Sequence, residues 1–142
     1  MPVVDLIAHS PDALWQVDVE QYGDQCVIGN IMSFKKQLQK AVPGGHSDVL
    51  TSKIMLGVFG CVPAFDRYFK IGSGLTSFSE KSLQRIFEYH NENAVTVRGL
   101  RVNSLDFFGN ATRFRYSRAK IIDIIFYETG KEISAKRAVK KS

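Results

Sequence analysis

The sequence predicts a mostly α protein, a single compact domain of five or six helices with room for one small β-hairpin near residues 100–116. Three observations support this prediction. Apolar residues recur at spacings of three and four in several stretches, which is the period of a helix that buries one face. Residues that start and stop helices bound these stretches. The 142 residues are enough to bury roughly two-thirds of the unfolded surface around one core.

Two helices are expected in the first third of the chain. Pro11, within a Ser-Pro-Asp sequence, is a helix-start signal, because proline at the first helical position loses no hydrogen bond. That helix should be short. Asp24 is a good N-cap for a longer helix, which the Pro-Gly-Gly sequence at residues 43–45 ends. The apolar residues of the longer helix repeat at helical spacing: Val27, Ile31, Phe34, Leu38 and Ala41.

Residues 48–59 should form the central helix of the fold. Ser47 or Asp48 can start this helix. Its side chains are apolar on most sides, so we expect it to be buried. Lys53 is its one long cation, and burial on such a helix favours a packing or ion-pairing role for that lysine.

The stretch GVFGCVPAFDRYF at residues 57–69 places helix breakers and a carboxylate inside an apolar run. Pro63 ends an extended segment, and a new short helix opens with Asp66 in its first turn. There the carboxylate faces free amides and the positive end of the helix dipole. Asp66 is therefore either a helix cap worth about 1 kcal/mol, or a functional carboxylate at the mouth of a cleft beside Arg67 and Tyr68.

The second half of the chain begins with a predicted flexible loop over residues 71–75. Ser77 and Glu80 can form a capping box for the helix that follows. Alternating polar and apolar residues then predict a small hairpin or an extended excursion over about 100–116.

The last predicted helix spans about residues 117–127 and is apolar around most of its circumference. A Thr-Gly sequence at 129–130 follows it. We therefore expect a helical domain over residues 1–130, and a basic tail or terminal helix over residues 131–142.

The charges favour a phosphate-rich partner. The net charge is +5, and cations cluster within residues 98–120 and in the last residues of the chain. Each cation that neutralises a phosphate releases a condensed counterion, so such clusters suit DNA or RNA. A solvated basic face without a partner is the alternative. The residues expected to bind nucleic acid are Arg67, Arg113, Arg115, Arg118 and Lys120.

Metal, cofactor and membrane functions have little support in the sequence. Cys26 and Cys61 are too far apart for a paired zinc motif, and both are expected to be small core residues. His9 and His46 have no carboxylate pattern around them, so we expect no metal and no cofactor. No stretch approaches the ~20 apolar residues of a membrane span, and the first residues lack the cationic region of a secretory signal. These features predict a cytoplasmic protein without a membrane partner.

Most of the chain resembles a family of uncharacterised bacterial proteins of similar size. The resemblance lies in the run TSKIMLG at residues 51–57 and the run GCVPAFDRYF at residues 60–69. It extends to AKIID at residues 119–123. This resemblance implies no function.

A second resemblance is to the helix-hairpin-helix DNA glycosylase superfamily. Glycines at 44–45, a Ser-Lys pair ending in Lys53, a Pro-x-x-Asp sequence ending in Asp66 and an aliphatic-Asp sequence ending in Asp123 occur in that family's order. The hairpin lacks the family's Gly-hydrophobe-Gly sequence, and the chain is shorter than a working glycosylase requires.

The second resemblance implies roles for two residues. Asp66 would correspond to the carboxylate that stabilises a developing sugar cation, and Lys53 at most to the Schiff-base lysine. A base-flipping enzyme also needs an aromatic or apolar pocket for the extruded base. The residues that could line it are Trp15, Tyr68 and Phe69.

Arg85 and His90 fit the Arg-x4-His spacing of HEPN-type ribonucleases, a resemblance that implies an RNA-cleaving alternative. On a regular helix two residues five apart point about 140° apart. His90 also shares its face with apolar residues, so a hydrogen-bonded core histidine is the competing interpretation.

Three functional hypotheses follow. The first is a small nucleic-acid-binding protein with a helix-hairpin-helix-like fold, a catalytically degenerate relative of the glycosylases. The second is an enzyme that acts on nucleic acid, through Asp66 and Lys53 or through Arg85 and His90. The third is a protein-interaction module of a bacterial defence or toxin system. Whether the protein is an enzyme stays open at this stage.

Overall fold

The computed structural model describes the chain except residues 1, 44–46, 101–102, 106–109 and 142, and only the backbone of residues 98, 103–105 and 111–115. The predicted mostly α fold is confirmed. The described residues form seven α-helices, where five or six were expected, with two 3₁₀ helices and two short strands. In chain order these are α1 (Pro2–Ala8), η1 (Asp12–Gln16), η2 (Val19–Gly23), α2 (Gln25–Ala41), α3 (Asp48–Phe59), α4 (Arg67–Ser73), α5 (Glu80–Glu92), α6 (Ala94–Gly99), β1 (Asn103–Leu105), β2 (Ala111–Arg115) and α7 (Arg118–Lys141).

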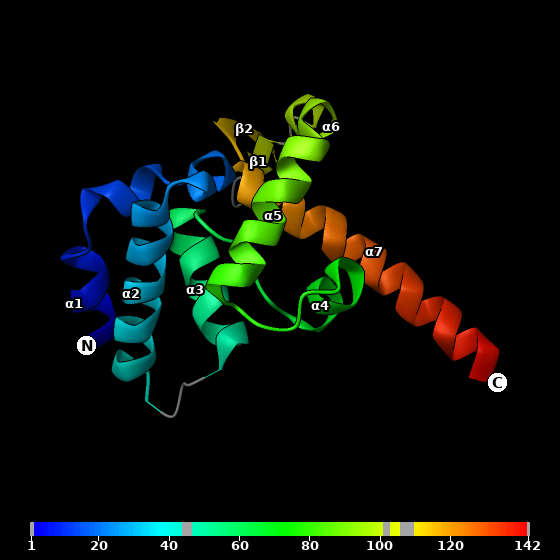
Figure 1. Cartoon of the computed structure of the whole chain (residues 1–142), viewed down its shortest axis with the longest axis horizontal. Coiled ribbons are helices and arrows are strands. Elements are labelled where there is room, and N and C mark those ends of the chain that lie inside the picture. The colour runs from blue at the N-terminus through cyan, green and yellow to red at the C-terminus, as the bar shows by residue number, and fades with distance from the viewer. Residues whose placement is uncertain (1, 44–46, 101–102, 106–109, 142) are drawn as a thin grey trace.

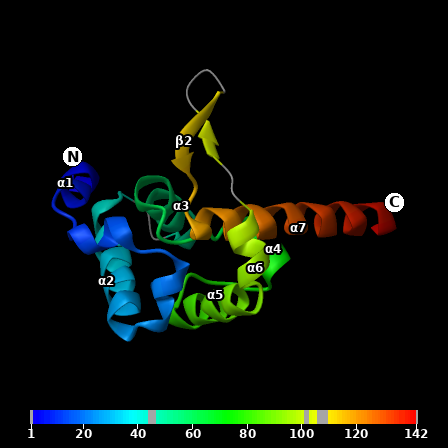
Figure 2. The ribbon, with the colours of Figure 1, turned by 90° about the horizontal axis from the view of Figure 1, so that it is seen from above.

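The helices form one body from which α7 projects. α1 and α2 pack together at the end that holds the N-terminus, and α3 and α5 occupy the middle (Figure 1). α4 packs against α7, which continues past the other helices to the opposite end of the molecule (Figures 1 and 2). β1 and β2 pair antiparallel, with Asn103 opposite Arg115, and point away from the helices (Figure 2).

The two helices with the strongest sequence signals form where they were predicted. α2 begins after Asp24, whose carboxylate accepts the Cys26 amide at 2.8 Å. Cys26 itself is exposed, so its predicted place in the core is wrong. α3 starts after Ser47 and ends at Gly60, whose φ of 67° is the left-handed conformation that favours glycine. The buried side chains of α2 are Ile28, Ile31, Phe34 and Leu38.

Residues 60–66 are a non-helical segment that runs through the core between α3 and α4, and we call them the core loop. Residues 61–65 are all buried. Buried backbone groups need partners, and side chains provide them here. The Tyr22 hydroxyl donates to the Cys61 carbonyl, and the Phe65 amide donates to the Ser52 hydroxyl at 2.8 Å.

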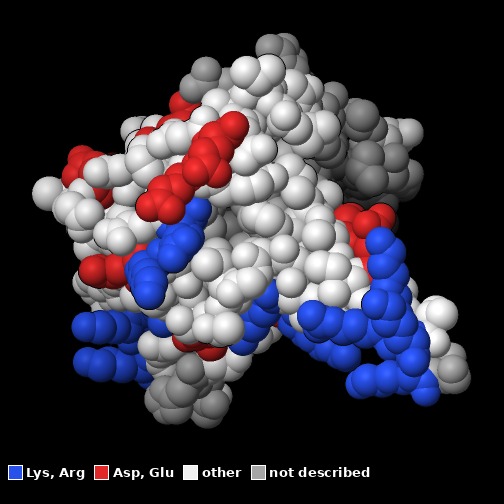
Figure 3. All heavy atoms as spheres, turned by 45° about the vertical axis from the view of Figure 1, so that its right-hand side comes forward, with Lys and Arg blue, Asp and Glu red and all other residues white. Residues whose placement is uncertain are grey.

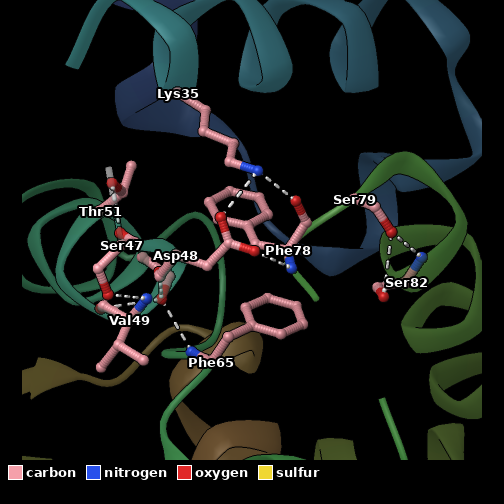
Figure 4. Close-up of polar contacts among 10 residues, drawn as sticks. Lys35, Ser47, Asp48, Val49, Thr51, Phe65, Phe78, Ser79 and Ser82 are labelled. Atoms are coloured by element: carbon pink, nitrogen blue, oxygen red, sulfur yellow. Dashed lines mark hydrogen bonds and ion pairs between the residues drawn. The ribbon is translucent and has the colours of Figure 1, made fainter. Parts of the chain in front are cut away.

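A polar network around Phe78 joins α2 and α3 to the start of α5. The Asp48 carboxylate accepts the Phe78 amide at 3.0 Å and pairs with the Lys35 ammonium at 3.1 Å (Figure 4). Lys35 also donates to the Phe78 carbonyl, and its ammonium lies 4.9 Å from the centre of the Phe78 ring. The ring itself stacks on Phe65, with centroids 5.2 Å apart.

This network explains why the predicted capping box of Ser77 and Glu80 is wrong. Both backbone groups of Phe78 are engaged by side chains, so the chain does not enter the helix there. Ser79 caps α5 instead, and its hydroxyl accepts the Ser82 amide at 3.3 Å.

Asp18 connects the N-terminal part of the chain to α7. Its carboxylate accepts the amides of Arg118 at 2.8 Å and Ala119 at 2.9 Å, the first two residues of the helix. It also accepts the Val19 amide at the start of η2. Next to it, Glu20 forms an ion pair with Arg118. A carboxylate at a helix N-terminus satisfies free amides and interacts favourably with the helix dipole, so Asp18 holds both segments together.

α4 and α7 cross at a contact between their backbones. A Cβ atom at Gly72 would overlap the Phe126 carbonyl oxygen, and one at Gly130 would overlap the Tyr68 carbonyl oxygen. Only glycine permits so close an approach. This contact explains two differences from the sequence predictions. α4 occupies part of the expected loop at 71–75, and α7 does not end near residue 127 but continues through Gly130, so that residues 131–141 are helical, one of the two alternatives expected for them.

The glycine contact predicts a large effect of one methyl group. We expect Gly130→Ala to lower the free energy of unfolding by at least about 2 kcal/mol, because overpacking here meets backbone rather than a side chain that can move. Gly29→Ala is the matched control, since Gly29 is an exposed position within α2 with nothing within 4 Å of the added Cβ. It should raise stability by about 0.5–1 kcal/mol. Chemical denaturation measures both, and equal effects of the two substitutions would contradict the contact.

Candidate functional site

A cleft of about 860 Å³ lies between α3 and the first half of α7, with residues of the core loop in its wall. Its size is within the range of sites for small organic ligands. Lys53 and Asp66, the two residues predicted as catalytic, both line it. The other polar and aromatic residues of α7 and the turn before it that line the cleft are Tyr116, Ser117, Lys120, Asp123, Tyr127 and Glu128.

Asp66 is the N-cap of α4. One of its carboxylate oxygens, Oδ1, accepts the Phe69 amide at 2.9 Å. The predicted helix cap is therefore confirmed, with Asp66 just before the first turn instead of within it. Within the described part of the chain, the second carboxylate oxygen has no hydrogen-bond partner, and the residue lines the cleft. A catalytic role for Asp66 stays a prediction.

Lys53 is exposed, contrary to its expected burial. The reason is its place on α3. The buried residues of this helix lie on one side, whereas Lys53 shares the cleft face with Leu56 and Gly57, at spacings of three and four. Its ammonium can therefore meet a ligand in water-accessible space, and a catalytic role for it also stays a prediction.

Asp123 is a buried carboxylate in the α7 wall, 6% exposed. Its Oδ1 accepts the Ala64 amide of the core loop at 3.0 Å, and its Oδ2 lies 3.6 Å from the Lys120 ammonium. Burial raises the pKa of Asp123 above the usual aspartate value, and the carboxylate of Asp66 raises it further, while Lys120 and the Ala64 amide lower it. The cleft thus contains two interacting carboxylates in different environments.

The aromatic residues of the cleft differ from those expected. Phe69 is fully buried, and Trp15, 51% exposed, packs edge-on against Phe59 with centroids 4.6 Å apart. Tyr68 packs edge-on against Tyr127 instead of lining the cleft. The aromatic side chains in the lining are Phe59, Tyr116 and Tyr127.

The sequence does contain a signal for the α7 wall. Lys120, Asp123 and Tyr127 follow one another at spacings of three and four, which places them on one face of α7, and Tyr116 lies four residues before Lys120, just outside the helix. Polar and aromatic residues on one stripe of an otherwise apolar helix indicate a lined cavity. Only the polar character of Lys120 and Asp123 was apparent from the sequence alone.

The three residues expected to bind nucleic acid whose side chains are described, Arg67, Arg118 and Lys120, have different surroundings. Lys120 lines the cleft, with its ammonium 5.9 Å from the centre of the Tyr116 ring. Arg118 is engaged by Glu20, and Arg67 is exposed with its guanidinium 5.7 Å from the Tyr68 ring centre. The side chains of Arg113 and Arg115 lie outside the described residues.

Arg85 and His90 do not converge. Arg85 is exposed and lines a second cavity, of about 640 Å³, beside α5, whereas His90 is 2% exposed and does not line it. Among the described residues neither ring nitrogen of His90 has a hydrogen-bond partner, so the predicted core position is confirmed but its expected hydrogen bond is not seen. This geometry adds no support to the HEPN-like alternative.

Nucleophilic chemistry by Cys61 is disfavoured. Burial raises the pKa of the Cys61 thiol to about 12, so the nucleophilic thiolate is scarce near neutral pH. Within the described residues no three His, Cys, Asp or Glu side chains are close enough together to hold a metal ion.

Comparisons with known proteins give no indication of function. No family model matches the chain, and searches of curated proteins and of solved structures also give no match. None of the described helices combines the length and apolar character that crossing a membrane requires.

The contact between Asp123 and the core loop can be tested through stability. Asp123→Ala leaves the buried Ala64 amide without a partner and should cost about 1–3 kcal/mol. Asp123→Asn keeps an oxygen acceptor and cannot ionise. Because the raised pKa means that the wild type loses stability as the pH rises through that value, Asp123→Asn should equal or exceed wild type near neutral pH.

The advantage of Asp123→Asn should shrink as the pH falls and wild-type Asp123 takes up its proton. Chemical denaturation across this pH range measures both variants. If Asp123→Asn is as unstable as Asp123→Ala at every pH, Asp123 stabilises the fold mainly through its ion pair with Lys120 and not through its hydrogen bond to the Ala64 amide.

Proposed function

We propose that the protein binds nucleic acid, with one nucleotide in the cleft and the flanking phosphates along α7. The observation that carries this proposal is the course of α7. Its first half lines the cleft as far as Glu128, and its last turns carry cations. We call residues 131–141 the basic end of α7; its cations are Lys131, Lys136, Arg137, Lys140 and Lys141, against one carboxylate, Glu132.

The basic end supports phosphate binding by its exposure and position. Its cations are all exposed, and Figure 3 shows Lys and Arg side chains gathered at this end of the molecule. Lys131 lies 3.8 Å from Glu128 at the rim of the cleft, so the basic end starts where the cleft stops. Glu128 and Glu132 are the carboxylates that a strand leaving the cleft along α7 would meet, and the five cations of the basic end outnumber them.

The cleft supports the nucleotide part of the proposal by its mixture of groups. Lys53 and Lys120 face it from opposite walls and suit a phosphate. Tyr116 and Tyr127 offer aromatic surface, and a base stacked on such a ring gains about 1–3 kcal/mol. The second oxygen of Asp66 is an acceptor for amino groups of a base or hydroxyls of a sugar.

The proposal predicts how charge removal affects binding of short DNA and RNA oligonucleotides in fluorescence anisotropy. The affinity should fall steeply with salt, and the double variant Lys53→Ala/Lys120→Ala should bind about tenfold more weakly with a reduced salt slope. The control is Lys36→Ala/Lys40→Ala, which removes the same net charge from exposed positions on α2, a helix that contributes no residue to the lining of the cleft. Absence of binding at low salt, or equal losses for the two double variants, would contradict the proposal.

A second candidate function, an enzyme acting on nucleic acid, is favoured by the free oxygen of Asp66 in the cleft. Asp66→Asn tests it cleanly, because asparagine is also a good N-cap and should preserve the start of α4. A carboxylate that stabilises developing positive charge should be worth about 100-fold or more in rate, so base release from damaged DNA should fall by that factor. Asp24→Asn is the matched control, since Asp24 caps α2 outside the cleft. If the wild type releases no base, or if Asp66→Asn and Asp24→Asn both release it as fast as the wild type does, this candidate is rejected.

A further inference from the structure

The ion pair between Lys120 and Asp123 is unequal in two respects. The carboxylate is buried, with its side chain 8% exposed, whereas the lysine side chain is 33% exposed and reaches the cleft. Their charged atoms are 3.6 Å apart, longer than the 2.7–2.9 Å or so of a tight charge-assisted hydrogen bond. Lys120 can therefore turn to a ligand in the cleft, whereas Asp123 stays where the Ala64 amide holds it.

Every wall of the cleft brings a charge or a titratable group toward this pair. α3 contributes Lys53, and the cap of α4 contributes Asp66. The α7 side contributes Tyr116, Tyr127 and Glu128 besides the pair itself. Asp66 and Glu128 are carboxylates like Asp123 and cannot compensate the negative charge of ionised Asp123. Lys120, whose ammonium lies 3.6 Å from the Asp123 carboxylate, compensates that charge most directly.

An anionic ligand changes the charge balance around Asp123. If a phosphodiester binds Lys120, Asp123 loses the attraction of that ammonium and gains a further negative charge nearby. A buried carboxylate in this position is stabilised by protonation. The proton adds to Oδ2 from solvent, and Oδ1 continues to accept the Ala64 amide, so the core loop does not have to move.

We propose that a phosphodiester enters the cleft together with one proton, which Asp123 takes up, so that Asp123 makes binding stronger as the pH falls. This inference rests on the proposed function and assigns to Asp123 a positioning and proton-accepting role in the same site. The cleft would then prefer anions because Lys120 can leave the Asp123 carboxylate and pair with the phosphodiester instead.

Titration of a short DNA oligonucleotide over about pH 5 to 8 tests the proposal, because phosphodiesters do not titrate in this range. The affinity of the wild type should rise as the pH falls, by at most about tenfold per pH unit, which is the slope for uptake of one proton. Asp123→Asn, which is neutral at every pH and keeps the acceptor for Ala64, should bind at high pH as tightly as the wild type does at low pH, with most of the pH dependence gone.

Glu128→Gln is the matched control, because it removes an exposed carboxylate from the same cleft. It should strengthen binding slightly and keep the wild-type slope. Calorimetry of the wild type in buffers of different ionisation enthalpy gives an independent readout and should detect uptake of close to one proton per bound oligonucleotide.

Two results would overturn the inference, and only the second would also overturn the proposed function. Binding by the wild type with the same pH slope in Asp123→Asn, and no proton uptake by calorimetry, rejects the role of Asp123 and leaves nucleic-acid binding intact. No binding of the oligonucleotide by the wild type at any pH rejects the proposed function and this inference together.

Discussion

The need to satisfy the backbone of a buried loop constrains much of this structure. Loops usually run over the surface, because a buried amide or carbonyl without a partner costs about 1–3 kcal/mol. Residues 61–65 are buried nevertheless. Tyr22 from η2, Ser52 from α3 and Asp123 from α7 supply the partners, so three elements far apart in the chain are fixed relative to the core loop. The loop in turn places Asp66 at the start of α4, beside the cleft.

α7 both holds the fold together and lines the candidate site. Asp18 binds its first amides, and the contact of Gly130 with α4 fixes it further along. The cleft uses the face between these two points, so Lys120 and Asp123 project from a segment held at both ends, as a precise binding site requires. The basic end lies beyond Gly130 and projects from the body, which makes it accessible to an extended partner (Figure 2).

Part of the candidate site was predictable because capping is a local property. A carboxylate followed by a new helix after a proline turn indicates an N-cap, and Asp66 is one. Lys53 was recognised from its type, but its exposure depended on which face of α3 meets the core. Asp123 emerged only from the fold, because its partner, the Ala64 amide, is 59 residues away in the sequence. The same is true of Tyr116 and Tyr127, which share the cleft with α3 only after α7 has packed.

The sequence by itself determined the mostly α class, the bounds of α2 and α3 and the capping roles of Asp24 and Asp66, because periodicity and caps act within a few residues along the chain. The tertiary structure decided where α5 begins, how far α7 extends and which residues face the cleft. Phe78 is withheld from α5 by side chains of α2 and α3, and Gly130 stays helical because α4 approaches its backbone. The stretch GVFGCVPAFDRYF shows the difference: its breakers mark a turn, but only packing reveals that the turn is buried and that its carboxylate faces a cleft.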